Sequence, residues 1–357
     1  MTVWSLAFEF PTEVATGIKA QARLEVPGAV NSLAFSPDGK TLAVGTSDFG
    51  AVLGSQAGAT LWDTATLTKR TTFRYPQSAD SVYPPSVNSV AISPNGRTLA
   101  IGSCSIEYDE SSGDFIGRQG QVDLWDLATL RKKATLQDER GAFSTAFSPD
   151  SSILAVSLAG STTDQDEVRL CDAETLEQRQ TVECDFGLRH SLFYAEPTLA
   201  FSRDGTRLAI LEEDRVILWH IGEDWTHTLA PLSQNEGCAV AFFPTGHVLA
   251  VNRGEIELWN IDLETTQTTL KHPPVWGGGT LAISSDGRRL AVAGSWESEG
   301  LSCGRAEVWD VCDGTRRATV DLLTDDTGIC AVSFSPDGKT LVTGSENGWV
   351  WLWTISE

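Results

Sequence analysis

The residues best suited to acid–base, nucleophilic or metal chemistry are scattered along this sequence. The histidines share no repeated spacing and stand at His190, His220, His227, His247 and His272. Seven cysteines include no Cys-x-x-Cys pair, so neither a zinc site nor a disulfide framework is indicated. The acidic run 164–167 lacks the spacing and central glycine of a calcium loop, and the glycines 277–279 lack the Gly-Lys-Ser/Thr of a phosphate loop. These patterns predict no catalytic residue, metal or cofactor.

Carboxylates and aromatic side chains gather instead in a few segments between apolar runs. The segment 103–120 combines acidic, aromatic and basic side chains, namely Glu107, Tyr108, Asp109, Phe115 and Arg118. Other segments hold Asp164, Asp166, Glu196, Trp276, Trp296, Glu297 and Glu299. Aromatic anchors among carboxylates suit a peptide with basic or aromatic character, because the charges steer the partner and the rings hold it. For any single segment, a solvated acidic surface that only maintains solubility is the alternative.

The elements that must position these residues repeat seven times. Each unit opens with an apolar run that ends in a turn, such as VNSLAFSPDG at 30–39, and the others occupy 87–96, 142–151, 196–205, 237–246, 278–287 and 329–338. A second short run follows, then a third that carries tryptophan in six units, at Trp62, Trp125, Trp219, Trp259, Trp309 and Trp353. A fourth run, such as 68–73, completes the unit. Short apolar runs bounded by Pro, Gly and Asp predict four β-strands per unit.

These repeats resemble those of the WD-repeat family over roughly residues 20 to 357. The resemblance implies an all-β fold, a seven-bladed β-propeller of four-stranded antiparallel blades, with the six tryptophans in structural positions. It also implies a role in binding other proteins, although a fold alone does not specify function. The family's Gly-His pair before the first strand is absent from every unit. We therefore expect apolar packing to supply most of the stability of the blades.

The two ends of the chain predict how the ring closes. The last strand, 349–354, is a third strand, so the seventh unit has no fourth strand of its own. The segment 19–26 precedes the first unit and is expected to complete the last blade, which removes an exposed sheet edge. We thus predict one propeller domain at 19–357 and an extension at 1–18, for which an extra strand or a partial eighth blade is the alternative. Trp349, Trp351 and Trp353 alternate, so they should share the sheet face beside the closing strand.

Long links are confined to one end of the predicted propeller. They connect second to third strands at 46–59, 103–120, 158–167 and 295–305, and fourth to first strands at 74–86 and 184–196. Strand alternation places both kinds at the same end, here called the long-loop end, and leaves short turns at the opposite, tight-turn end. Loops on a rigid scaffold commonly carry recognition, so we predict that the long-loop end binds the partner. Neutral drift is the alternative, because long surface loops cost little stability.

Charge and hydropathy narrow the classes of partner. The chain of 357 residues has 48 acidic and 26 basic side chains, a net charge of −22, which repels nucleic acid. No apolar stretch approaches the roughly 20 residues of a membrane span, so we expect no membrane association. The amino terminus lacks the pattern of a secretory signal. With its odd number of unpaired cysteines, the chain is expected to be a reduced, cytoplasmic protein; its oligomeric state is open.

A propeller hydrolase or lactonase, or a small-ligand binder with a loop-built site at the channel mouth, is the alternative function. Such enzymes place carboxylates and histidines around the axial channel. Positions two to four of the seven first strands contain neither, and only Cys238 and Cys330 among them can ionise. Glu196 alone stands at the rim. We therefore predict a non-enzymatic scaffold that binds protein or peptide.

Overall fold

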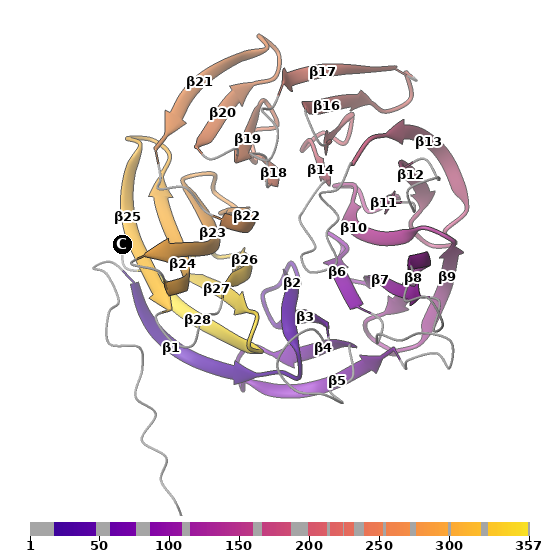
Figure 1. Ribbon diagram of the computed structural model, residues 1–357, viewed down its shortest axis with the longest axis horizontal. Coiled ribbons are helices and arrows are strands. Elements are labelled where there is room, and N and C mark those ends of the chain that lie inside the picture. The colour runs from indigo at the N-terminus through magenta and orange to yellow at the C-terminus, as the bar shows by residue number, and fades with distance from the viewer. Residues whose placement is uncertain are drawn as a thin grey trace, which may run out of the picture.

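A computed structural model describes residues 18–47, 58–75, 86–108, 115–159, 166–186, 199–212, 215–223, 225–231, 239–252, 255–271, 276–298, 301–322 and 328–355. Within these ranges every regular element is a strand, and the strands form seven four-stranded antiparallel sheets. The sheets are arranged as blades around a central axis (Figure 1). The prediction of an all-β, seven-bladed propeller is therefore confirmed.

Blades 1 to 3 take their strands consecutively from the chain, starting at the axis. Blade 1 contains β2 (Ala29–Phe35), β3 (Thr41–Ser47), β4 (Gly58–Asp63) and β5 (Thr68–Arg74). Blade 2 contains β6 (Ser86–Ile92), β7 (Thr98–Tyr108), β8 (Phe115–Asp126) and β9 (Lys132–Asp138). Blade 3 contains β10 (Gly141–Phe147), β11 (Ile153–Ala159), β12 (Asp166–Asp172) and β13 (Gln178–Cys184).

Blades 4 to 6 follow the same order. Blade 4 contains β14 (Leu199–Phe201), β15 (Arg207–Leu211), β16 (Arg215–His220) and β17 (Trp225–Pro231). Blade 5 contains β18 (Ala239–Phe242), β19 (Val248–Asn252), β20 (Ile256–Asn260) and β21 (Thr265–Leu270). Blade 6 contains β22 (Trp276–Ile283), β23 (Arg289–Ser298), β24 (Leu301–Asp310) and β25 (Thr315–Leu322).

Blade 7 joins the two ends of the chain, as the sequence predicts. β1 (Ile18–Glu25) pairs antiparallel with β28 (Trp349–Ile355), which continues to β27 (Thr340–Ser345) and β26 (Ile329–Phe334). The guanidinium of Arg23 lies 3.7 Å from the ring centroid of Trp349 and 5.2 Å from that of Trp351. The rings of Trp351 and Trp353 stack at 5.5 Å, so the three tryptophans share one face beside the closing strand. Apart from Ile18, the predicted extension lies outside the described residues.

The hydrophobic core is divided among the interfaces between blades. Seven clusters of buried side chains each join two adjacent blades; for example, Leu61 of blade 1 packs with Leu99 of blade 2. Near the axis the blades come so close that only glycine fits at some positions. A Cβ on Gly344 would lie 2.3 Å from Cγ1 of Val30 in the next blade. A single blade cannot bury its apolar faces by itself, so the stability of each blade depends on both neighbouring blades.

The turns at the tight-turn end are built on a repeated serine–aspartate contact. In blade 1 the buried Ser36 hydroxyl donates to Oδ1 of Asp38 at 2.6 Å, and the Lys40 amide donates to the same oxygen at 3.1 Å. These bonds hold the pKa of Asp38 below its usual value, the serine hydroxyl having the largest effect. The turn closes through Gly39 at φ +69°, a left-handed conformation that glycine adopts without strain. Blades 3, 4, 6 and 7 repeat the serine–aspartate bond, and blade 2 uses Asn95.

The lowered pKa of these aspartates predicts acid sensitivity. Their carboxyl groups titrate lower in the folded than in the unfolded chain, so their stabilising effect is present above about pH 4 and is lost as the pH falls through the folded-state values. Asparagine makes the same turn contacts without titrating, as Asn95 shows. Exchange of Asp38, Asp150, Asp286 and Asp337 for asparagine should therefore flatten the fall in unfolding free energy between about pH 5 and about pH 3, measured by urea denaturation. Equal slopes for the two proteins would contradict this explanation.

The closing strand offers a second test. Arg23→Ala removes the cation–π contact with Trp349 and Trp351 and should lower the free energy of unfolding by about 0.5–2 kcal/mol. Lys19 lies exposed on the same strand, so Lys19→Ala serves as the matched control and should change the unfolding free energy by less than about 0.5 kcal/mol. Denaturant unfolding compares the two. An equal loss in both variants would show that the contact does not stabilise the closure.

Candidate functional site

The segment 103–120 of blade 2, expected to be a loop, is mostly a β-hairpin. β7 and β8 have 11 and 12 residues, whereas the matching strands of blades 1, 3, 4, 5 and 7 have 5 to 7. The ladder pairs Ile106 with Arg118, Glu107 with Gly117 and Tyr108 with Phe115. The loop expectation is wrong here because isoleucine, tyrosine and phenylalanine favour extended backbone and continue the antiparallel pairing outward. The backbone thus brings four of the five predicted contact residues to the end of one hairpin, while Asp109 lies outside the described residues.

The segment 295–305 of blade 6 is also a hairpin rather than a loop. β23 and β24 pair Trp296 with Cys303 and Glu297 with Ser302. Trp276, expected in a link, begins β22 and pairs with Ser295, so the ladder brings the backbones of the two predicted contact tryptophans close together. Glu299 lies outside the described residues. The hairpins of blades 2 and 6 stand on opposite sides of the ring (Figure 1).

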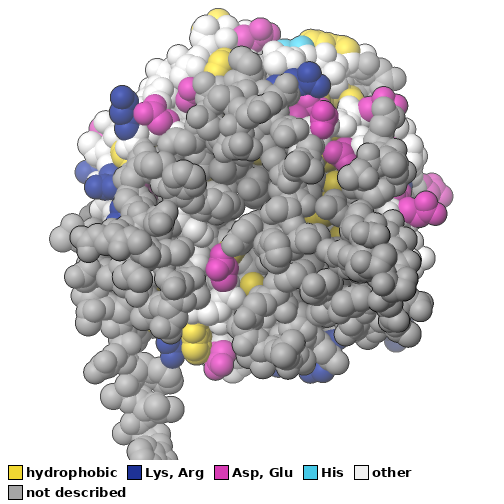
Figure 2. Space-filling model, viewed as in Figure 1, with side chains coloured by type: hydrophobic (Ala, Val, Ile, Leu, Met, Phe, Trp, Pro, Cys, Tyr) yellow, Lys and Arg dark blue, Asp and Glu magenta, His cyan; other side chains and the backbone are white. Residues whose placement is uncertain are grey.

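Of the remaining predicted contact residues, one has a structural contact and the others lie outside the described residues. Asp166 is the first residue of β12, and its Oδ2 accepts a hydrogen bond from the Phe186 amide at 2.8 Å. Since Phe186 is buried, this carboxylate helps to fix the chain after β13. Asp164 and Glu196 lie outside the described residues. Figure 2 shows acidic side chains of described residues at several places around the rim of the face in view.

The axial channel has polar, uncharged walls in its described part. A cavity of about 190 Å³ lies there, lined by serine, asparagine, threonine and apolar side chains. The polar groups tie blades together: the Val90 amide donates to Ser32 Oγ at 3.1 Å, and the Thr145 amide donates to Ser89 Oγ at 3.0 Å. Among the described residues no group of three histidine, cysteine or acidic side chains could hold a metal ion. That same part of the chain contains no helix long and apolar enough to cross a membrane.

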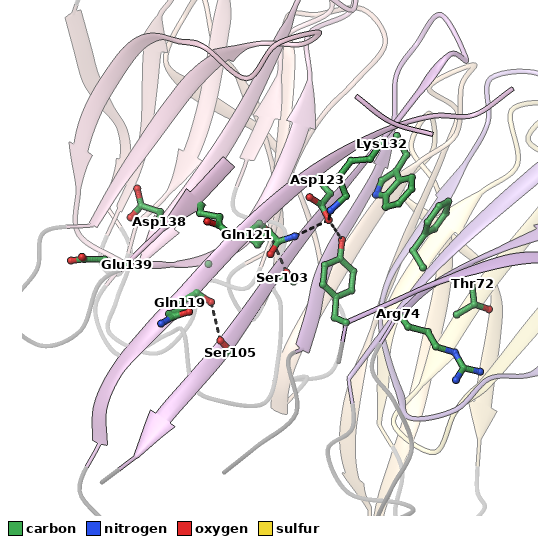
Figure 3. A pocket seen from close by; sticks show the side chains of 15 residues that line it. Thr72, Arg74, Ser103, Ser105, Gln119, Gln121, Asp123, Lys132, Asp138 and Glu139 are labelled. Carbon is green, nitrogen blue, oxygen red and sulfur yellow. Dashed lines mark hydrogen bonds and ion pairs between the residues drawn. The ribbon is translucent and has the colours of Figure 1, made fainter. Parts of the chain in front are cut away.

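A larger cavity, of about 770 Å³, lies between blades 1 and 2 and extends toward the long-loop end (Figure 3). The rings of Phe73 and Trp125, with centroids 4.4 Å apart, form part of its lining. Its other lining residues are mostly polar and come from β5, β7, β8, β9 and the residues directly after β5 and β9, including Ser103, Ser105, Gln119, Gln121, Gln137, Asp138 and Glu139. The sequence alone did not predict this site. The available signal was the carboxylate of Asp123, two residues before Trp125 on a strand whose alternate positions face the interior.

Asp123 is the most deeply buried charge of this cavity, with its side chain 1% exposed. Its Oδ2 accepts hydrogen bonds from the Tyr75 hydroxyl at 2.9 Å and from Gln121 Nε2 at 2.8 Å, and the Lys132 ammonium lies 2.9 Å away. Its Oδ1 accepts a bond from the Thr135 hydroxyl at 2.6 Å. Burial, reinforced by the charge of Asp123, raises the pKa of Tyr75 well above its usual value, so the phenol keeps its proton. The described cluster holds the carboxylate fixed and supplies no activated nucleophile.

An ion-pair network holds the neighbouring wall in place. Arg140 contacts Asp138 at 2.7 Å and Glu167 at 2.8 Å, while Arg169 contacts the same two carboxylates at 2.9 and 2.6 Å. Although burial acts to raise it, hydrogen bonds from Arg140 hold the pKa of Asp138 below its usual value. The network joins β9 to β12, and since Asp138 lines the cavity, it fixes one side of the opening.

Seven four-stranded blades around an axial channel define a β-propeller. The family model for the WD domain, G-beta repeat, matches residues 19–51 and 319–354, which lie on both sides of the ring closure. These two matched repeats and the seven blades support a WD-repeat β-propeller. Members of this family are generally protein-interaction scaffolds and typically not enzymes. No curated protein matches the sequence.

The bond between Tyr75 and Asp123 can be tested by a double-mutant cycle. Tyr75→Phe keeps the ring but removes one donor to a buried carboxylate, so it should lower the unfolding free energy by about 1.5–3 kcal/mol. In an Asp123→Asn background the same change should cost about 1 kcal/mol or less, because the acceptor is then neutral. Urea denaturation of the four proteins measures the difference. The same cost in both backgrounds would mean that the ring environment, not the hydrogen bond, determines the effect.

Proposed function

We propose that this propeller is a scaffold that binds a protein or peptide at its long-loop end, with a partner side chain entering the cavity between blades 1 and 2. The observation that carries the proposal is this cavity of about 770 Å³. It lies along β7 and β8, whose outer ends bear Glu107, Tyr108, Phe115 and Arg118. The cavity and the hairpin therefore share β7 and β8 and lie toward the same end of the propeller.

The lining of the cavity favours a partner side chain with basic or aromatic character. Phe73, Tyr75 and Trp125 offer aromatic surface, and glutamine and serine side chains offer hydrogen bonds around it. The carboxylates Asp123, Asp138 and Glu139 outnumber the lining cations, Arg74 and Lys132. Pockets that combine an apolar floor with a few fixed polar groups are the usual form of a specific binding site. The ion-pair network beside Asp138 keeps this one preorganised.

A small-ligand binder is the second candidate, and the same cavity favours it. Its volume falls within the roughly 300–1,000 Å³ of small-molecule sites, whereas the channel cavity of about 190 Å³ is below that range. The cavity between blades 1 and 2 is therefore large enough for a small molecule, whereas the channel cavity is smaller than usual ligand sites. Saturable binding of a small metabolite, displaced by a bulky residue at Gln137, would favour this candidate.

The experiment compares three variants with the wild type for capture of partner proteins, quantified by mass spectrometry. The first replaces 107–117 by Asn-Gly, so that the paired Ile106 and Arg118 close a two-residue turn. The second, Gln137→Trp, places an indole at an exposed residue of the cavity wall. The matched control, Lys40→Ala with Lys339→Ala, removes exposed charges at the tight-turn end.

We expect the hairpin and cavity variants to lose a partner that the wild type and the control retain. The affinity should fall at least about tenfold, which corresponds to a loss of about 1.4 kcal/mol of binding free energy. Circular dichroism melts confirm that the trimmed protein remains folded. Equal recovery by all four proteins would place the interaction elsewhere on the molecule.

A further inference from the structure

The outer strand of each blade has one edge whose backbone groups pair with no further strand of the blade. Most of these outer strands carry basic side chains. Lysine or arginine occurs in β1, β5, β9, β13 and β25. Charges on an edge strand prevent it from pairing with another chain. The outer strands of blades 4 and 5 lack them: β17 reads WTHTLAP and β21 reads TTQTTL. Only β21 has no ionisable side chain and no proline.

β21 is also the most open of the outer strands. Its first five residues, 265–269, are all exposed, whereas every other outer strand has a buried or half-buried side chain within its first four residues. Four of its six residues are threonines, which favour extended backbone. An uncharged strand of high β-propensity, exposed on both faces, is suited to pair with a further strand.

The large hydrophobic side chains that are exposed in the described chain lie on blades 4 and 5, near this strand. The two large ones are Leu263, 70% exposed and two residues before β21, and Trp225, 44% exposed at the start of β17. The Trp225 ring stacks on His220 at 3.8 Å, and Nε2 of His227 lies 3.5 Å from Oε1 of Glu264. The second of these contacts joins blade 4 to blade 5, and the surface formed by Trp225, Leu263 and β21 is here called the blade 4–5 flank.

We infer that the blade 4–5 flank is a self-association surface, at which β21 pairs antiparallel with β21 of a second copy about a two-fold axis. The charges at the ends of the strand are self-complementary. Glu264, with a side chain 60% exposed, precedes it, and Lys271, 83% exposed, follows it. Antiparallel pairing turns the acidic end of each strand toward the basic end of the other, twice in one dimer. Threonines facing each other across such a pair are a favourable combination.

The net charge of the chain supports this location. Two copies that each carry −22 repel one another over most of their surfaces, and the uncharged strand lets them approach with the least repulsion. The contact is small: it involves one short strand and the side chains of Leu263 and Trp225 from each copy. We therefore expect a reversible dimer that forms in the micromolar range, because small interfaces are typical of weak association.

Sedimentation velocity of the full chain over a micromolar concentration series tests the inference, at about 0.15 M salt, where the Debye length is about 8 Å. The wild type should show a concentration-dependent shift from monomer to dimer. Thr268→Lys places like charges near the two-fold axis and should weaken the dimer at least about tenfold. Thr181→Lys makes the same change at an exposed position of β13 and should dimerise as the wild type does.

A charge-reversal pair separates loss of contact from loss of fold. Thr268→Lys and Thr268→Glu should each be monomeric alone, and a mixture of the two should recover a heterodimer because opposite charges then meet. A wild type that stays monomeric throughout the series overturns the inference and leaves the edge open to an extended segment of another protein. Dimerisation of Thr268→Lys equal to that of the wild type, or no recovery in the mixture, overturns it as well.

Discussion

The structure depends on packing between neighbouring blades, which is complete only when the ring is closed. Each of the seven apolar clusters draws side chains from at least two adjacent blades, so removal of one blade would expose at least two clusters. The pairing of β1 with β28 therefore does more than satisfy one sheet edge. It fixes the seventh blade against the first, where Val30 fills the space above Gly344. Such mutual dependence provides a rigid support for the surfaces at both ends.

Hydrogen bonds in the turns act beside the apolar packing between blades. The absence of the family's Gly-His pair led to the expectation that apolar packing supplies most of the stability. The structure shows a buried serine bonded to an aspartate or asparagine in six blades, and Asp63 accepts the amide of Thr66 at 2.8 Å in the turn after the third strand. In blade 7 Trp353 Nε1 donates to the Thr343 hydroxyl at 3.0 Å. Both residues of this hydrogen bond lie within the matched segment 319–354.

The sequence predicts those features that repeat or that follow from alternation along one strand. The seven units, the closing strand and the shared face of Trp349, Trp351 and Trp353 are of this kind. The sequence did not predict that most of 103–120 forms a hairpin. The length of a hairpin depends on how far two strands pair with each other, and the sequence of one strand does not show this. The cavity could not be predicted because it depends on a contact between distant parts of the chain. Tyr75 of blade 1 reaches Asp123 of blade 2 across 48 positions of sequence.

Both proposed surfaces occur where one blade departs from the pattern of the others. Asp123 shares its strand position with Glu257 of blade 5 and Glu307 of blade 6, but it accepts a hydrogen bond from Tyr75 of the neighbouring blade, and the groups that satisfy it line the cavity. Likewise, β21 has lost the basic residues that protect five other outer strands. The residues that repeat in every blade form the turns and the packing between blades. Residues that differ between blades can therefore determine what the protein binds. In a propeller of equivalent blades, comparison of the blades with one another can therefore identify binding surfaces without any related sequence.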